Sequence, residues 1–341
     1  MNSLLEVQDL NVSVRTVAGT RSITDHVSFR VLEKEIFGIA GESGCGKSTV
    51  VESVLRLITA PRFIDSGQVF LKGRDLLAMG KRELRDVRWK ELAYVPQGSM
   101  NTLSPVLKIR EQITDSILAH VKVSKAEALE MAVAALRSVG MSPDVTEMYP
   151  HELSGGMRQR VCIGLSTALK PSVIMADEPV TALDVVMQRL NLETLANLRD
   201  QIGITVVMVT HDMACHAEIC DRVCVMYAGR VAEIGETREL FAKPLHPYTS
   251  GLLKAVPSIT NKHSESIPGI APSPSAWPTG CRFHPRCPRK MDVCSRVVPL
   301  LKEISPGRFV ACHLHDGRAG TGAGSAGIGT STQTAGGSTN A

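Results

Sequence analysis

The feature that most constrains the fold is the octapeptide GESGCGKS at residues 41–48, which matches the pattern GxxxxGK[ST]. This pattern forms a phosphate-binding loop only between a strand and a helix, and both are predicted here. The apolar run Ile36–Ala40 precedes it, and a helical stretch over residues 49–58 follows it. A glycine-rich turn that binds nothing is the alternative, but it would not need all of these parts together. The chain is therefore predicted to bind a nucleotide.

Each part of this loop has a chemical role in holding phosphates. The glycines let the backbone bend, so that successive amides and the helix N-terminus face the anion. We expect Lys47 to reach the β and γ phosphates and Ser48 to hold Mg²⁺. The candidate ATP-binding residues are Gly41, Glu42, Ser43, Gly44, Cys45, Gly46, Lys47, Ser48 and Thr49.

Apolar runs of strand length recur along the chain and are separated by helix-like stretches. This alternation predicts the α/β class, with a largely parallel sheet. The predicted strands are Ile36–Ala40, Leu92–Val95 and residues 173–176, 205–210 and 223–226.

The composition is typical of a folded globular protein, and its net charge does not indicate a particular binding partner. Of the 341 residues, 43% are hydrophobic and 21% charged, while the 4% aromatic content argues against a surface that stacks nucleic-acid bases. The net charge of +4 is too small to imply polyanion binding. No apolar run approaches the roughly 18 to 20 residues that span a bilayer, and residues 1–9 lack the pattern of a secretion signal. We expect a cytoplasmic chain that reaches a membrane only through a partner.

Changes in amino-acid composition along the chain predict three parts. We expect an ATPase domain over residues 1–250, which contains a helical subdomain at about 98–170. A Pro-rich linker and a four-cysteine extension follow over residues 251–316, and the linker is expected to be extended rather than packed. Residues 317–341 are almost wholly Gly, Ser, Thr and Ala, so we expect a disordered tail there.

The clearest helix of the subdomain is predicted over residues 124–139. Ser124 and Glu127 form a capping box at its start, and Gly140 supplies the stop. The apolar stripe of this helix is predicted to be Leu129, Val133 and Leu136.

Two carboxylates, Asp177 and Glu178, directly follow the predicted strand at residues 173–176. Ligands of parallel sheets bind at the carboxyl edge where such strands end. We expect Asp177 to orient Mg²⁺ and Glu178 to act as the catalytic base that polarises the attacking water. Two acids after a strand are often only a solvated loop, but the phosphate-binding loop upstream favours the catalytic hypothesis. His211 follows the strand at residues 205–210, where it either caps the strand or senses the γ phosphate.

A second anion-binding helix start is predicted at Ser154, Gly155 and Gly156, within the sequence LSGGM. An isolated SGG would by default be a simple N-cap. Its position shortly before Asp177 and Glu178 disfavours that alternative, and here the chain resembles the ABC ATPase family. The resemblance covers roughly residues 4–250. It implies a P-loop NTPase core of ABC type, a dimer with ATP at the seam, and a signature that caps the nucleotide of the other subunit.

Other positions match the family one by one. Gln97 in YVPQG resembles the glutamine that senses Mg²⁺ and contacts the permease interface, and residues 181–184 resemble the dimer-facing loop. The resemblance thus makes Glu178, His211 and Gln97 the catalytic candidates. Importers of this type often stack adenine on an aromatic residue where this chain has Val14 and Arg15. The Mg²⁺ candidates are Ser48, Gln97 and Asp177.

The C-terminal region narrows the resemblance. The run PGIAPSPSAWPTGCRFHPRCP resembles the tail of dipeptide and oligopeptide importer ATPases, whose four cysteines are associated with an iron–sulfur cluster. That resemblance implies a 4Fe–4S cluster. From spacing alone, zinc with histidine ligands and independent free thiols remain open. The candidate cluster ligands are Cys281, Cys287, Cys294 and Cys312, and the competing histidines are His284, His313 and His315.

The leading functional hypothesis is ATP hydrolysis that drives solute import, with peptides as the favoured cargo. The implied partners are two integral-membrane permease subunits, a second, non-identical ABC ATPase and an external solute-binding protein, with no nucleic acid. The implied location is the cytoplasmic face of the membrane. The alternatives are a soluble ABC-type ATPase acting on DNA or ribosomes, which would carry long coiled coils or a tandem ATPase domain, and an isolated nucleotide-binding regulator.

Overall fold

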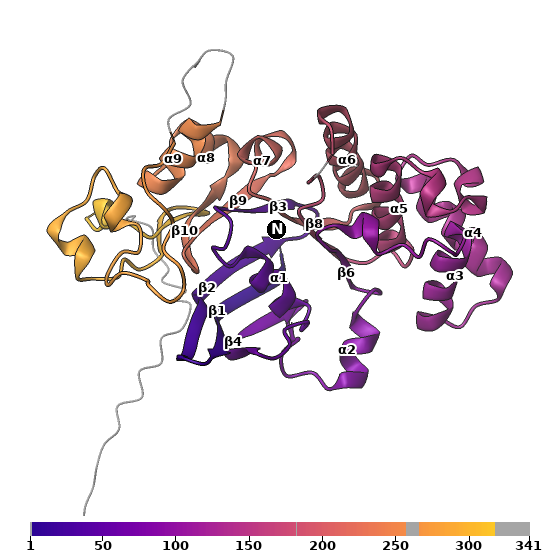
Figure 1. The fold of residues 1–341 in the computed structure, drawn as a ribbon, viewed down its shortest axis with the longest axis horizontal. Helices are drawn as coiled ribbons and strands as arrows, with labels where there is room; N and C mark the ends of the chain where they lie inside the picture. The colour runs from indigo at the N-terminus through magenta and orange to yellow at the C-terminus, as the bar shows by residue number, and fades with distance from the viewer. Residues whose placement is uncertain (1, 182, 257–265, 318–341) are drawn as a thin grey trace, which may run out of the picture.

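The computed structural model describes residues 2–181, 183–256 and 266–317. Within these residues the main sheet has eight strands, and it crosses the centre of the molecule (Figure 1). The strand order is β11-β12-β10-β9-β3-β8-β7-β6. The strands from β9 to β6 run parallel, so the predicted α/β class and largely parallel sheet are confirmed. The parallel strands are β3 (Ile36–Ala40), β6 (Leu92–Val95), β7 (Val173–Asp177), β8 (Thr205–Val209) and β9 (Arg222–Tyr227).

The central strands are buried on both faces. In β3, Ile36 and Ala40 enter one hydrophobic core, while Phe37 and Ile39 enter a second core on the opposite face. Alternate side chains of a strand point to opposite faces, so a strand between two cores is apolar throughout. This explains why the sequence shows these strands as continuous apolar runs.

A second, antiparallel sheet covers one face of the first and was not predicted. Its order is β2-β1-β4-β5, and its inner residues build the core that also holds Phe37 and Ile39. Bulges interrupt the pairing of β1 with β2 and β4, which breaks the strict alternation that marks a half-buried strand. The strands are β1 (Ser3–Thr16), β2 (Gly19–Leu32), β4 (Arg62–Leu71) and β5 (Arg74–Asp75).

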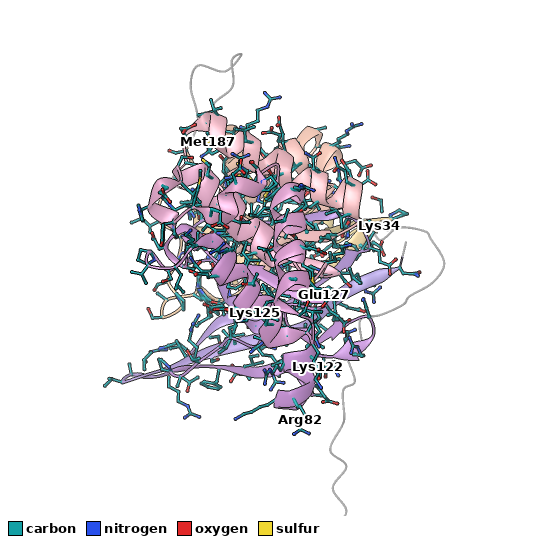
Figure 2. The ribbon with its side chains drawn as sticks, turned by 90° about the vertical axis from the view of Figure 1, so that its right-hand side faces the viewer. Lys34, Arg82, Lys122, Lys125, Glu127 and Met187 are labelled. Atoms are coloured by element: carbon teal, nitrogen blue, oxygen red, sulfur yellow. The ribbon has the colours of Figure 1, made fainter. Side chains whose placement is uncertain are left out.

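Three helices between β6 and β7 lie at one end of the molecule, beyond the edge strand β6 of the main sheet (Figure 1). They are α3 (Ile109–His120), α4 (Lys125–Ser138) and α5 (Gly155–Thr167). Figure 2 looks onto this end, with Lys125 and Glu127 of α4 near the viewer. The remaining helices are α1 (Lys47–Val54), α2 (Lys81–Val87), α6 (Val185–Asn197), α7 (Met213–Ile219), α8 (Thr237–Ala242) and α9 (Pro247–Ala255). In the described ranges, no helix combines the length and the apolar character needed to cross a bilayer.

The capping box of α4 is confirmed, but its predicted stripe is only partly correct. The Glu127 amide donates to Ser124 Oγ at 3.2 Å, and the Ser124 amide donates to the Glu127 carboxylate at 2.7 Å. Leu136 is buried, whereas Leu129 remains 37% exposed. The rest of the buried face is Ala128, Ala132 and Ala135. Small side chains let α4 approach its neighbours α3 and α5 closely, so alanines take the place that larger residues were expected to fill.

We expect Ser124→Ala to destabilise α4 by about 1 kcal/mol, because the hydroxyl that caps an amide of the first turn is lost. Amide hydrogens in α4 should then exchange roughly fivefold faster through local opening. Ser124→Thr is the matched control, since it keeps a hydroxyl at the cap. Equal exchange rates in the alanine variant and the wild type would contradict the assignment.

The C-terminal segment is joined to the main sheet rather than set apart from it. Strand β10 (Arg230–Glu236) pairs with β12 (Arg308–Val310), which pairs in turn with β11 (Lys302–Ser305). In the described part of the Pro-rich stretch, Ile267, Ala271 and Trp277 pack against the core. Except for Gly317, the predicted disordered tail lies outside the described residues.

A buried ion pair fixes this junction. Arg308 donates to Glu233 at 2.6 Å, and their side chains are only 5% and 0% exposed. The Glu233 carboxylate also accepts from the amides of Leu245 and His246 at 2.8 and 2.9 Å. Removing one partner of such a pair leaves a buried charge uncompensated, which costs about 3–5 kcal/mol.

Candidate functional site

The phosphate-binding loop lies between β3 and α1, as predicted. Gly41 has φ of 148°, and an added Cβ would lie 2.3 Å from the Met226 carbonyl oxygen, so a side chain does not fit there. Gly46 has φ of 103° and immediately precedes α1. Lys47 is buried, and its Nζ donates to the carbonyls of Gly41 and Glu42 at 2.8 and 3.1 Å. The ammonium group is thus held within the loop where phosphates would bind.

A cavity of about 580 Å³ opens beside this loop and collects the predicted catalytic residues. Gln97, Glu178 and His211 line it together with Lys47 and Ser48. Gln97, Glu178 and His211 follow β6, β7 and β8 in that order, and the carboxyl ends of these strands meet at one edge of the sheet. Residues that are far apart in the sequence therefore share one site.

Ser48 and Asp177 have the donor set expected for Mg²⁺. Asp177 ends β7 and is 2% exposed, and its Oδ1 has no hydrogen-bond partner among the described residues. Burial raises the pKa of Asp177 above its usual value, while a hydrogen bond from Ser48 opposes the rise. A buried carboxylate oxygen without a partner, next to a hydroxyl, fits a hard cation or its bound water.

Glu178 is held from several directions. Its carboxylate interacts with His211 Nδ1 at 2.8 Å and accepts from the Thr181 and Thr210 hydroxyls at 2.7 and 3.2 Å. Burial opposes ionisation, but the hydrogen bonds from His211 and Thr181 outweigh it and hold the pKa of Glu178 below its usual value. The backbone of Glu178 is left-handed, with φ of 51°, a conformation rare for a residue with a side chain. The site thus keeps an ionised carboxylate in a fixed place.

Within the described part of the chain, the residues of the predicted signature, Ser154, Gly155 and Gly156, do not line this cavity. Ser154 caps α5 by accepting from the Met157 amide at 3.3 Å, and its side chain is exposed. A helix N-terminus that faces solvent is free to bind an anion carried by another molecule.

The dimer-facing loop predicted at residues 181–184 is described except for Ala182. Its Thr181 contacts Glu178, and its Asp184 caps α6 by accepting from the Met187 amide at 2.9 Å. The first residues of α6, Val185 and Val186, are 80% and 67% exposed. This loop therefore connects the carboxylate of Glu178 to an apolar surface open to solvent.

Sequence reasoning missed two apolar residues of the cavity, Ile23 from β2 and Leu252 from α9. Apart from His211, no aromatic ring lines the cavity within the described residues. The Arg15 guanidinium instead lies over the ring of Phe63, 5.0 Å from its centre. No local motif marks Ile23 or Leu252, because each reaches the site only through the tertiary fold.

The predicted 4Fe–4S cluster is wrong. Within the described ranges, no group of three or more His, Cys, Asp and Glu side chains could hold a metal ion, so the zinc alternative fails as well. Cys281 and Cys287 instead pack against the hydrophobic core, and burial raises the pKa of both thiols. Burial raises the pKa of Cys312 to about 11, and the neighbouring thiols of Cys281, Cys287 and Cys294 contribute to the rise. Cys281 and Cys287 thus serve as small apolar side chains.

Comparisons with known proteins agree on one family. Residues 24–181 match the family described as "ABC transporter", and residues 232–294 match "Oligopeptide/dipeptide transporter, C-terminal region". The dipeptide transport ATP-binding protein DppD of Caldanaerobacter subterraneus is 41% identical over 93% of this chain and 98% of its own length. The oligopeptide transport ATP-binding protein OppD of Salmonella typhimurium is 40% identical over 91% of this chain and 93% of its own.

Solved structures show the same architecture. The dimeric structure of MJ0796, a bacterial ABC transporter cassette, superposes with a TM-score of 0.61 at 26% identity. The superposition covers 69% of this chain and 99% of the MJ0796 chain. A post-hydrolysis state of the same cassette, bound to ADP and Pi, gives the same TM-score at 25% identity.

Proposed function

This chain belongs to the ABC transporter family, and from that premise we propose that it hydrolyses ATP to drive peptide import through a membrane transporter. The observation that carries the proposal is the cavity shared by the phosphate-binding loop, Gln97, Glu178 and His211. The relatives named above, a dipeptide and an oligopeptide transport ATP-binding protein, support peptides as the cargo. Both are transport proteins, which gives no support to an ATPase acting on DNA or ribosomes.

Several polar residues in and beside the cavity have a role in phosphoryl transfer to water. Lys47 and the loop amides bind the phosphates, and Ser48 and Asp177, with Gln97 nearby, would hold Mg²⁺. Bound Mg²⁺ supplies charge neutralisation on the phosphates. Glu178 orients the attacking water and accepts its proton, while His211, which contacts the Glu178 carboxylate and lines the same cavity, senses the γ phosphate. Phosphoryl transfer needs positioning and charge more than covalent chemistry, and this set provides both.

The exposed signature completes the site of a second subunit. Ser154 and the following glycines cap the nucleotide held by the partner ATPase, so ATP lies at the seam of a dimer. The dimeric cassette structure supports this arrangement. We further propose that the second ATPase is related but not identical, and that the pair docks on two permease subunits at the cytoplasmic face. An external solute-binding protein delivers the peptide.

Reconstitution tests this function. The chain, co-expressed with its permeases and the second ATPase, should co-purify with them and, in liposomes, accumulate a labelled peptide only with ATP and the solute-binding protein. Peptide and binding protein together should stimulate ATP hydrolysis. ATP hydrolysis without permease association, or stimulation by nucleic acid, would reject the transport function in favour of the soluble alternative.

A further inference from the structure

An arginine from the C-terminal extension reaches the phosphate-binding loop. Arg286 forms a two-pronged ion pair with Glu42, with Nη1–Oε2 and Nη2–Oε1 distances of 2.7 and 3.0 Å. The arginine side chain is 7% exposed, and that of Glu42 27%. Bidentate arginine–carboxylate pairs are strong and fix geometry as well as charge.

Both partners of this pair are held in place by further contacts. Arg286 donates through Nε to the Pro268 carbonyl at 2.8 Å and through Nη1 to the Tyr227 hydroxyl at 3.3 Å. The Glu42 amide donates to the Tyr248 hydroxyl at 2.9 Å. The contact with Pro268 therefore holds the guanidinium in place. Arg286 binds the side chain of Glu42, and Tyr248 binds its backbone amide.

Glu42 also lines the nucleotide cavity. A carboxylate beside bound phosphates repels them, and the repulsion is strong where water is partly excluded. Arg286 cancels this charge at contact distance. Without Arg286, the loop that must attract a polyanion would present an uncompensated negative group.

We propose that Arg286 is a positioning residue for nucleotide binding, which acts by neutralising Glu42, so that the extension sets the affinity for ATP. The proposal rests on the ATPase function proposed above. It gives the extension a role in the nucleotide site that does not require a metal.

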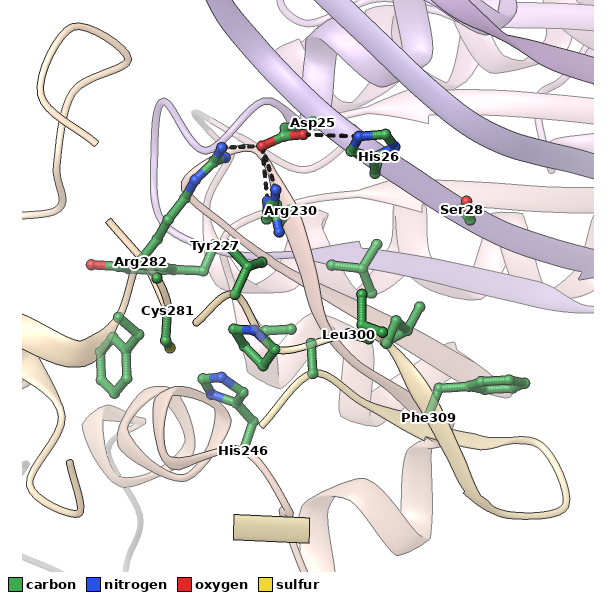
Figure 3. A pocket seen from close by; sticks show the side chains of 18 of the residues that line it. Asp25, His26, Ser28, Tyr227, Arg230, His246, Cys281, Arg282, Leu300 and Phe309 are labelled. Carbon is green, nitrogen blue, oxygen red and sulfur yellow. Dashed lines mark hydrogen bonds and ion pairs between the residues drawn. The ribbon is translucent and has the colours of Figure 1, made fainter. Parts of the chain in front are cut away.

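A second arginine of the extension provides a matched control. Figure 3 shows Arg282 and Arg230 both directed at Asp25. Arg282 is ion-paired with Asp25, and Arg230 keeps its own contact with that carboxylate at 2.7 Å. Loss of Arg282 thus leaves no carboxylate uncompensated. Among the described residues, those that line the nucleotide cavity do not include Asp25.

The test measures the Kd for Mg-ATP by titration calorimetry on the full chain, together with KM and kcat of the complex. Arg286→Gln should weaken ATP binding about tenfold and raise KM with kcat nearly unchanged. Adding Glu42→Gln to that variant should restore the Kd to within about threefold of wild type, because the unpaired charge is gone. Arg282→Gln should stay within about twofold, since it removes an arginine without exposing a charge.

The single variant Glu42→Gln distinguishes neutralisation of the Glu42 charge from a purely mechanical hold of Arg286 on the loop. It leaves Arg286 as an unpaired cation beside the phosphates, so ATP binding should tighten about two- to threefold. This measurement also decides the matter if Arg286→Gln fails to fold. Weaker binding in Glu42→Gln, equal weakening in the double variant and in Arg286→Gln, or unchanged binding in Arg286→Gln would each overturn the proposal. A wild-type chain that binds no ATP would instead reject the proposed function.

Discussion

Glu178→Gln should lower the ATP turnover of the assembled complex by about 10²–10⁴-fold, because an amide cannot accept the proton of the attacking water. The hydrogen bonds from His211 and Thr181 keep the native carboxylate ionised, so the base is available at neutral pH. Lys47 and the loop amides are untouched, and ATP binding is expected to stay within about threefold of wild type. Single-turnover hydrolysis and nucleotide titration measure the two quantities separately.

Glu193→Gln is the matched control for this prediction. Glu193 lies on α6, is 52% exposed and contacts Arg189 on the same helix, so its replacement should leave turnover unchanged. The closed dimer should also accumulate in Glu178→Gln with ATP, and size-exclusion chromatography would detect it. Turnover within a few-fold of wild type would remove Glu178 from the role of base.

Ser154→Arg should block turnover at the site where we propose that this chain caps the nucleotide of its partner. The exposed start of α5 is where we propose that the opposing phosphates approach, and a bulky side chain would keep the two subunits apart. We expect hydrolysis to fall by about 10²–10³-fold, as when an enzyme loses an anion-stabilising group. ATP binding by the isolated subunit should survive, because Ser154 does not line its cavity.

Ser142→Arg provides the control for Ser154→Arg. Ser142 is another exposed serine, which caps a short 3₁₀ helix over Pro143–Glu147 by accepting from the Asp144 amide. Placing arginine there should change turnover by no more than about twofold, since surface substitutions are usually mild. Loss of ATP binding by the isolated Ser154→Arg subunit would place this serine in the subunit's own site and contradict the dimer hypothesis.

The parts of the fold that could be predicted are those with a local cause. The central strands are recognisable because burial on both faces makes them continuously apolar, as in Ile36–Ala40. The capping box at Ser124 is likewise a pattern of neighbouring residues. The antiparallel sheet escaped prediction because its bulges disrupt alternation, and the stripe of α4 was misjudged because close helix packing favours alanine over larger residues.

The same distinction holds for the site. The phosphate-binding loop, Asp177 and Glu178 belong to contiguous motifs at strand ends, so their convergence follows from the topology of a parallel sheet. Ile23 and Leu252 enter the cavity from distant segments without any motif of their own. For the cysteines, the family resemblance implied a cluster, but whether side chains form a metal site depends on packing that neither resemblance nor spacing determines.

The two short strands at the end of the described chain, β11 and β12, also protect this protein from aggregation. Without β12, the backbone of β10 would be an open sheet edge, a surface that recruits strands from other molecules and promotes aggregation. The outermost strand, β11, is short and carries Lys302 and Glu303, and both features discourage further strand addition. A chain cut before Arg308 would lose this protection and leave Glu233 without its cation. The extension is therefore a poor place to trim the protein when a smaller ATPase is wanted.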